Sequence, residues 1–241
     1  MRYFIELSYN GKNYHGWQMQ PDAISIQEKL NEALSKVWQE TIEVVGAGRT
    51  DTGVHAKQMF AHFDVQSQVK EEIVYKLNSI LPNDIVVSKL VEVEPEKHAR
   101  FDAVSRSYEY KIWLGRNPFL LDFYWQIHSQ YLDVEAMNQA AKILLKYKDF
   151  QSFSKVKTDV YTYNCDIFDA YWEVNNEELT FYISANRFLR NMVRAIVGTM
   201  VDVGLGKISV LDFEEIIKSK NRSNAGLSVP AHGLFLTEIK Y

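Results

Sequence analysis

Residues 46–56 read Gly-Ala-Gly-Arg-Thr-Asp-Thr-Gly-Val-His-Ala, and this stretch excludes two nucleotide-binding α/β folds. It begins with two glycines of a dinucleotide-binding fingerprint, but Asp51 stands where the third glycine is needed. A carboxylate there would repel a pyrophosphate. The Gly-Lys-Ser/Thr ending of a phosphate-binding loop is also missing. What remains is a glycine-rich loop that presents Arg49 and Asp51 together, since they are one residue apart in a turn.

The hydrophobic patterns on either side of this loop predict a mixed fold. Alternating apolar residues predict strands at 2–9, 41–45, 59–65, 85–93, 108–114, 166–174, 179–185 and 233–240. Apolar residues at helical spacing predict helices at 26–37, 71–81, 133–146, 188–203 and 209–217. Hairpin-like neighbours outnumber strand–helix–strand units. The sequence therefore favours an α+β fold with a largely antiparallel sheet.

Several local signals predict where helices begin and end. Ser25 with Glu28 forms a capping box, and Ser209 with Asp212 opens a later helix in the same way. Gly204 follows the long apolar helix and is a candidate C-cap.

The second half of the chain repeats the order of strands and helices without repeating the sequence. No proline- or serine-rich linker separates the two halves. We therefore expect two α+β halves, residues 1–104 and residues 105–241, that share one sheet or one interface.

Length and composition describe an ordinary folded protein. The 241 residues are 46% hydrophobic and 24% charged, and a chain of this length can bury a substantial core without disulfides. Cys165 is the single cysteine, so no internal disulfide is possible and the cytoplasm is the simplest compartment. The most apolar stretch, 195–206, is broken by Asp202 and is too short to span a bilayer.

The charge is unevenly distributed along the chain. The formal net charge is −4, which argues mildly against a nucleic-acid partner. However, residues 97–116 hold five basic and two acidic residues, and residues 187–222 hold seven basic and four acidic ones, a net +3 in each. Residues 166–178 hold five acids and no base. A basic groove on an acidic body and a set of solvated faces both fit this pattern.

The loop at 46–56 does not look like a metal site. Asp51 and His55 could supply two ligands, but no third ligand stands at a useful spacing, so we predict no metal. No fingerprint of a cofactor is present either. On its residues alone the loop is either a surface turn with a local ion pair or a functional site of the kind that collects between strands.

Residues 48–56 resemble the signature of the tRNA pseudouridine synthases that modify the anticodon arm. The resemblance continues in order along nearly the whole chain. Further matching segments are Tyr14–Gln18, Gln27–Leu30, His98–Phe101, Arg106–Tyr110, Asn186–Arg194, Ile196–Gly198 and Pro230–Leu236. Met19 departs from the family pattern, in which many relatives carry arginine at that place.

The resemblance implies roles for particular residues. It makes Asp51 the catalytic carboxylate, Arg194 its cationic partner, and Tyr108 the active-site tyrosine that stacks on the uracil. It implies that Arg49 helps to extrude the target base. Arg187, Arg190 and Arg194 also stand at i, i+3 and i+7, which predicts one stripe of the late helix, and we include Arg187 and Arg190 as substrate-binding candidates.

The resemblance also implies an activity and an architecture. The activity is isomerisation of uridine to pseudouridine at positions 38, 39 and 40 of tRNA, which needs no cofactor because no redox step occurs and no group is acquired. The partners are tRNA and a second copy of the chain in a homodimer. The expected fold has two similar ferredoxin-like halves sharing a largely antiparallel mixed sheet flanked by helices, with a central RNA-binding cleft. The first half carries the catalytic loop, and the second carries the tyrosine and arginine.

Two other functional classes compete with this interpretation. A non-catalytic RNA-binding α+β module is the main alternative, although the stacked-aromatic pattern of common RNA-binding sheets is absent. A small-molecule enzyme using Asp51 and Arg194 is the other, and no cofactor fingerprint supports it.

Overall fold

The computed structural model describes residues 1–66, 68–70, 72–128, 131–156 and 160–241. The chain forms two compact units. The N-terminal unit comprises Met1–Val104 and Phe235–Tyr241, and the C-terminal unit comprises Ser105–Leu234. The last seven residues thus belong with the N-terminal unit, whereas the sequence-based boundary placed them in the second half.

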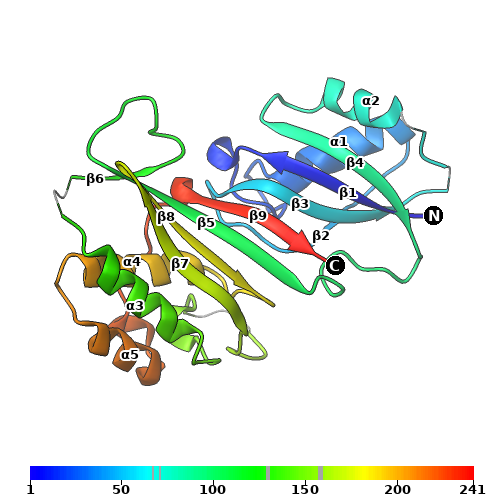
Figure 1. Ribbon diagram of the computed structural model, residues 1–241. Helices are drawn as coiled ribbons and strands as arrows, with labels where there is room; N and C mark the ends of the chain where they lie inside the picture. Colours follow the sequence, from blue (N-terminus) through cyan, green and yellow to red (C-terminus); the bar gives the residue numbers. More distant parts are fainter. Residues whose placement is uncertain (67, 71, 129–130, 157–159) are drawn as a thin grey trace. The chain divides into compact units, whose positions relative to one another are not determined.

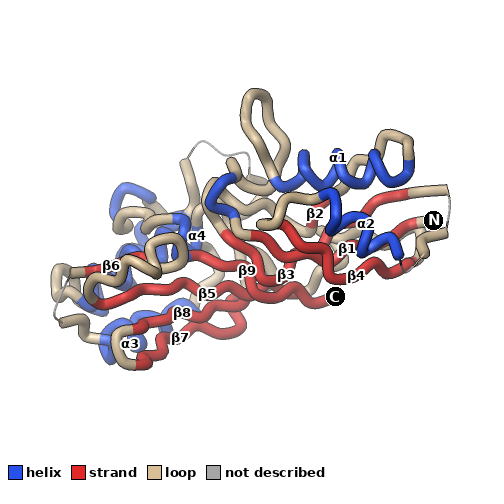
Figure 2. The backbone as a smooth tube through the Cα atoms, turned by 90° about the horizontal axis from the view of Figure 1, so that it is seen from above, coloured by secondary structure: helices blue, strands red, loops and turns tan. Residues whose placement is uncertain are grey.

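The N-terminal unit has the strand order of a ferredoxin-like fold. Along the chain it contains β1 (Arg2–Tyr9), α1 (Ile26–Trp38), β2 (Val45–Gly46), β3 (His55–Asp64), α2 (Glu72–Ile80), β4 (Ile85–Val93) and β9 (Leu234–Lys240). The order β4-β1-β3-β2 is antiparallel throughout, and β9 pairs with β3 in parallel at Ala56↔Leu236. Figures 1 and 2 show α1 and α2 on one side of these strands. The predicted ferredoxin-like arrangement is confirmed for this half.

The C-terminal unit follows a similar strand–helix–strand–strand–helix order, with an extra strand before its first helix and a second helix at its end. It contains β5 (Ser105–Leu114), β6 (Trp125–Ile127), α3 (Val134–Leu144), β7 (Ile167–Asn175), β8 (Glu178–Ala185), α4 (Met192–Gly204) and α5 (Val210–Ser219). The strand order is β6-β5-β8-β7, in which β5–β8 and β8–β7 are antiparallel and β5–β6 is parallel. The helix α3 packs against β7, α4 and α5 (Figure 1). The largely antiparallel α+β fold expected from the sequence is thus present.

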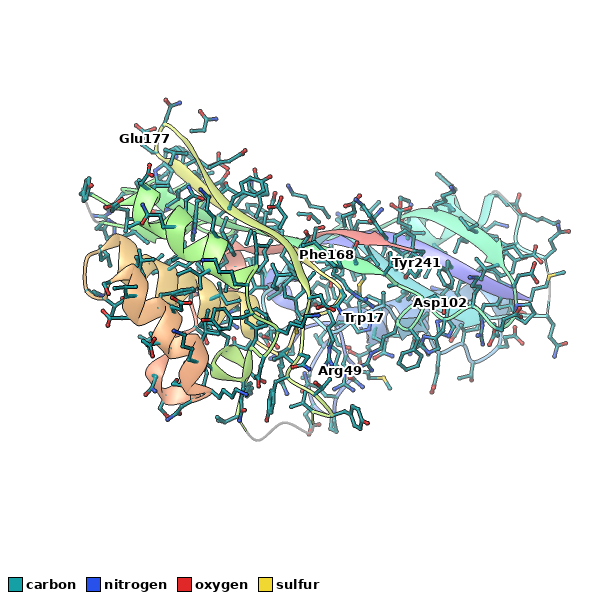
Figure 3. All side chains as sticks on the ribbon, turned by 60° about the horizontal axis from the view of Figure 1, so that its bottom comes forward. Trp17, Arg49, Asp102, Phe168, Glu177 and Tyr241 are labelled. Carbon is teal, nitrogen blue, oxygen red and sulfur yellow. The ribbon has the colours of Figure 1, made fainter. Side chains whose placement is uncertain are left out.

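Most local predictions are confirmed. Both capping boxes are present, with the side chains of Ser25 and Ser209 accepting from the N–H groups three residues on. The strands predicted at 166–174 and 179–185 form an antiparallel hairpin that turns at Asn176, which has a φ of 54°, and Glu177 lies at its tip (Figure 3). Glu71, the first residue of a predicted helix, lies outside the described residues.

The predicted strand at 41–45 is wrong, because β2 contains only Val45–Gly46. The backbone of the preceding residues bonds to side chains of α1 instead of to another strand. Val44 N–H donates to Asn31 Oδ1 at 2.9 Å, and Ile42 N–H donates to Ser35 Oγ at 2.9 Å. Two of the apolar residues that suggested a strand, Ile42 and Val44, are still buried, whereas Val45 is exposed.

The predicted start of the long apolar helix is also wrong. The helix α4 begins at Met192 and not at residue 188, because Asn191 adopts a left-handed conformation with a φ of 66°. Arg187 and Arg190 therefore precede the helix, and the predicted three-arginine stripe does not exist. The C-cap prediction fails as well: Gly204 lies inside α4, and Gly206 takes the positive φ, 69°.

His62 is a buried histidine near the C-terminal end of β3. It is 4% exposed, and its Nδ1 accepts the N–H of Ala99 at 3.2 Å. Burial lowers the pKa of His62 from 6.5 to about 4, and the charges of Arg2 and His98 add to this effect, while those of Asp64 and Asp102 partly oppose it.

We expect acid to destabilise the fold through His62. Below pH 6.5 the histidine is protonated in the unfolded chain, whereas in the folded protein it takes up the proton only near pH 4. The free energy of unfolding should therefore fall as pH drops from 6.5 to 4, by about 3 kcal/mol. Urea titrations across this range would measure it. His62→Gln keeps an acceptor but cannot titrate, so an equally steep fall in that variant would contradict the assignment.

None of the helices in the described part of the chain combines the length and the hydropathy that a membrane crossing requires.

Candidate active site

The loop at 46–56 connects β2 to β3 and is anchored through a buried threonine. Thr50 is 8% exposed, and its Oγ1 lies 2.9 Å from the hydroxyl of Tyr9. Its carbonyl accepts the N–H of Trp17 at 3.1 Å. Its two neighbours face outward: Arg49 is exposed and Asp51 is half-buried. The anchored Thr50 thus lies between two side chains that are at least partly accessible.

The segment between β1 and α1 forms the floor of this loop. A Cβ on Gly16, which has a φ of 89°, would lie 2.4 Å from the carbonyl oxygen of Thr50. A Cβ on Gly11 would lie 2.0 Å from the carbonyl oxygen of Val54. Backbone therefore lies directly on backbone at both places, and only glycine allows this approach.

Trp17 and Tyr14 support the loop from within the N-terminal unit. Trp17 is 3% exposed, and a Cβ on Gly46 would lie 2.5 Å from its indole ring. Tyr14 is equally buried, with its hydroxyl donating to Asp84 at 2.5 Å. Aromatic rings at these positions could either contact RNA or pack under the loop. Their burial shows that they pack.

His55 has a structural environment. It is 1% exposed, its Nδ1 accepts the N–H of Gly11 at 3.0 Å, and its ring stacks on Phe235 at a centroid distance of 4.6 Å. Among the described residues, no group of three histidine, cysteine or acidic side chains is placed to hold a metal. The same is true of the described residues around Asp51.

Arg194 lies in the first turn of α4 and is oriented by a backbone carbonyl. Its Nε–H donates to the carbonyl of Val229 at 2.7 Å, and Val229 N–H donates to the carbonyl of Arg194 at 3.3 Å. The side chain is half-buried. The first bond directs the guanidinium, and the second holds the backbone of Val229 against the helix, both within the C-terminal unit.

Tyr108 lies on β5 beside fully buried neighbours. Tyr110 and Ile112 are 0% exposed, whereas Tyr108 is half-buried and meets the ring of Phe188 edge-on at 5.1 Å. Its ring therefore sits at the margin of the core, where a planar ligand could stack.

Arg187 and Arg190 lie in the segment between β8 and α4. Arg187 donates to the carbonyl of Thr162 at 3.4 Å. Arg190 is exposed, and its carbonyl accepts the N–H of Lys155 at 3.1 Å. Arg49 and Asp51 thus belong to the N-terminal unit, and Tyr108, Arg187, Arg190 and Arg194 belong to the C-terminal unit.

Comparison with known proteins assigns the chain to a family. The model of the tRNA pseudouridine synthase family matches residues 7–102 and 140–241. The chain belongs to the tRNA pseudouridine synthase family. A relative from Parabacteroides distasonis is 49% identical, and one from Bacteroides fragilis is 51% identical, each over 100% of this chain and 96% of the relative. A relative from Bacillus licheniformis is 40% identical over 100% of this chain and 99% of the relative. All three are named tRNA pseudouridine synthase A.

The matched ranges of the synthase family include most candidate residues. Asp51 and Arg49 fall in the first range, and Arg194 falls in the second. Tyr108 falls between the two ranges, so its role depends on the β5 geometry and on the sequence motif.

The reaction that defines pseudouridine synthases is an isomerisation. The bond between N1 of uracil and C1′ of ribose breaks, and a bond between C5 and C1′ forms. A proton leaves C5, and N1 regains one, so no atom is gained or lost. A carboxylate, a cation and a planar side chain are suitable groups for this chemistry.

Proposed function

We propose that this chain isomerises uridine to pseudouridine at positions 38, 39 and 40 in the anticodon stem-loop of tRNA, with Asp51 as the catalytic carboxylate. The full-length similarity to proteins named tRNA pseudouridine synthase A supports the substrate. The geometry that carries the catalytic assignment is the burial of Thr50, which turns Asp51 outward on an anchored loop.

In this proposal Arg194 keeps Asp51 ionised. A carboxylate enclosed with a base and a ribose would tend to take up a proton unless a cation stands beside it. An ionised Asp51 next to the glycosidic bond can add to the ribose or the base, or can remove a sugar proton. The carbonyl of Val229 supports this role by directing the guanidinium of Arg194.

Tyr108 and Arg49 act on the target base. A uridine within a stem must leave its stack, which costs a few kcal/mol, and pocket contacts recover that cost. Arg49, exposed beside Asp51, helps to extrude the nucleotide. Tyr108 stacks on the uracil and helps to remove the proton from C5. Arg187 and Arg190 contact tRNA phosphates from the segment before α4, now as individual side chains and not as a helical stripe.

Two wider statements belong to the same proposal. The chain acts as a homodimer, which would bring the basic segments of two copies to one tRNA and would offset the net charge of −4. It works in the cytoplasm, where tRNA is modified.

The function is tested by mapping pseudouridine in tRNA. Unmodified tRNA transcripts incubated with the purified chain and no added cofactor should acquire pseudouridine at positions 38, 39 and 40 where these are uridine. Transcripts with cytidine at those positions serve as the control. Binding without any pseudouridine would instead favour the non-catalytic RNA-binding module.

A further inference from the structure

Residues 225–230 lie directly on the helix α4. A Cβ on Gly198 would lie 1.9 Å from the carbonyl oxygen of Leu227, so the two backbones are in contact there. One residue earlier, Gly226 N–H donates to Thr199 Oγ1 at 2.9 Å. The segment is therefore held at its beginning and middle against the helix that carries Arg194.

The far end of the segment bonds directly to Arg194. The carbonyl of Val229 accepts the Nε–H of Arg194, and the next carbonyl, that of Pro230, accepts the hydroxyl of the fully buried Tyr110 at 2.8 Å. Val229 is 4% exposed. The position of the Val229 carbonyl, and so the direction of the Arg194 guanidinium, depends on how residues 225–230 are held.

Arg222 ties this segment together. Its Nη1 donates to the carbonyls of Ala225 at 3.2 Å and Gly226 at 3.0 Å, and its Nη2 donates to Ser228 Oγ at 3.0 Å. Ser228 Oγ also accepts a short hydrogen bond from the side chain of Asn191, the residue that precedes α4. One guanidinium thus bonds to three residues of the segment, and through Ser228 it connects the segment to the start of the helix.

These contacts need the geometry of arginine. The partial burial of Arg222 lowers its pKa, because the charge has lost part of its hydration. The three acceptors are neutral, so the hydration that the guanidinium has lost is compensated by well-directed hydrogen bonds and not by an opposite charge. A guanidinium offers a rigid fork of donors, whereas the ammonium of lysine is a point charge on a flexible stem. Lysine at this position would keep the charge and lose the bracing.

We propose that Arg222 is a positioning residue for pseudouridine formation, acting through residues 225–230 on the guanidinium of Arg194. The inference rests on the proposed function, in which Arg194 pairs with Asp51. Arg222 itself touches no reacting atom in this assignment. It fixes the position of the Val229 carbonyl, which directs Arg194. A shift of that carbonyl matters because the reaction rate falls steeply when a catalytic group is misplaced.

The kinetic test compares Arg222→Lys with the wild-type chain on a tRNA transcript. We expect kcat to fall on the order of tenfold with KM for tRNA unchanged within about twofold. Ser152→Ala is the matched control, because Ser152 is fully buried in the same unit and loses a 2.7 Å bond to the Ile216 carbonyl. This control should lower the melting temperature and leave kcat unchanged.

A second measurement reports on Arg194 without catalysis. The side-chain Nε–H signal of Arg194 in ¹⁵N NMR is identified by its loss in Arg194→Lys. We expect its exchange with water to accelerate at least about fivefold in Arg222→Lys and to stay unchanged in Ser152→Ala.

Four results would overturn the proposal: an unchanged kcat, a rise in KM alone, an equal loss of kcat in Ser152→Ala, or an unchanged Nε–H exchange rate in Arg222→Lys. A wild-type chain that forms no pseudouridine, with the exchange change present, would instead remove the proposed function and leave the hold of Arg222 on Arg194 standing.

Discussion

Replacing Asp51 with asparagine is expected to abolish pseudouridine formation while tRNA binding persists. Asparagine has the same shape but cannot carry the negative charge that each possible first step requires. We expect a loss of at least about 10³-fold in kcat, as for other residues that act directly on the bond being broken. Single-turnover assays on a tRNA transcript, together with filter binding, would measure the two quantities separately.

Asp64→Asn is the matched control for this change. Asp64 lies on β3, at the opposite end from the loop, and pairs with Arg2 at 2.7 Å through a side chain that is 61% exposed. Its replacement removes one carboxylate from the same unit, so kcat should be unaltered. Pseudouridine formation at the wild-type rate in Asp51→Asn would exclude Asp51 as the catalytic carboxylate.

Features with a short-range cause were predictable from the sequence. The helices α1 and α5 begin where predicted, because a serine cap and an acidic residue three positions later bond to each other's backbone. The loop was also found at about the right place, since its glycines interrupt the strand pattern, although Gly46 belongs to β2 and His55 and Ala56 belong to β3. In each case the residues that determine the structure are neighbours in the sequence.

Features with a long-range cause were not predictable. Phe188, Leu189 and Met192 have helical spacing, yet α4 starts only at Met192. The preceding residues are held away from the helix by distant partners: Asn186 N–H donates to Asp166, and Lys155 N–H donates to the carbonyl of Arg190. Bonds between segments 20 or more residues apart leave no periodic trace in the sequence.

Arg222 was missed for a related reason. In the sequence it was one of seven basic residues between positions 187 and 222. Its partners are two backbone carbonyls and a serine hydroxyl. Every residue has a backbone carbonyl, so the sequence does not indicate which carbonyls an arginine will bind. The useful signal was Gly198, a glycine in the middle of an apolar helix, where glycine costs stability unless another backbone lies close.

The two candidate catalytic groups are positioned in a similar way. Asp51 is placed by the burial of its neighbour Thr50, and Arg194 is placed by the carbonyl of Val229. In both cases a glycine, Gly16 or Gly198, allows another backbone to lie against the supporting one. Precise placement of these side chains therefore depends on close backbone packing, which a single methyl group disrupts.

Gly16→Ala is expected to destabilise the N-terminal unit more than any surface substitution. The alanine would have to adopt a φ of 89° and place its Cβ 2.4 Å from the carbonyl oxygen of Thr50. The left-handed backbone costs about 1 kcal/mol, and relief of the overlap costs about 1–3 kcal/mol more. Urea titration should thus show a free energy of unfolding lower by about 3 kcal/mol.

Gly48→Ala separates this cause from a general intolerance of the loop to alanine. Gly48 lies two residues before Thr50, and a Cβ there would meet no atom within 4 Å. The substitution should leave stability unchanged or raise it by about 0.5 kcal/mol, because alanine restricts the unfolded chain. If both variants unfold at the same urea concentration, the contact of Gly16 with Thr50 does not anchor the loop, and Asp51 must be held in another way.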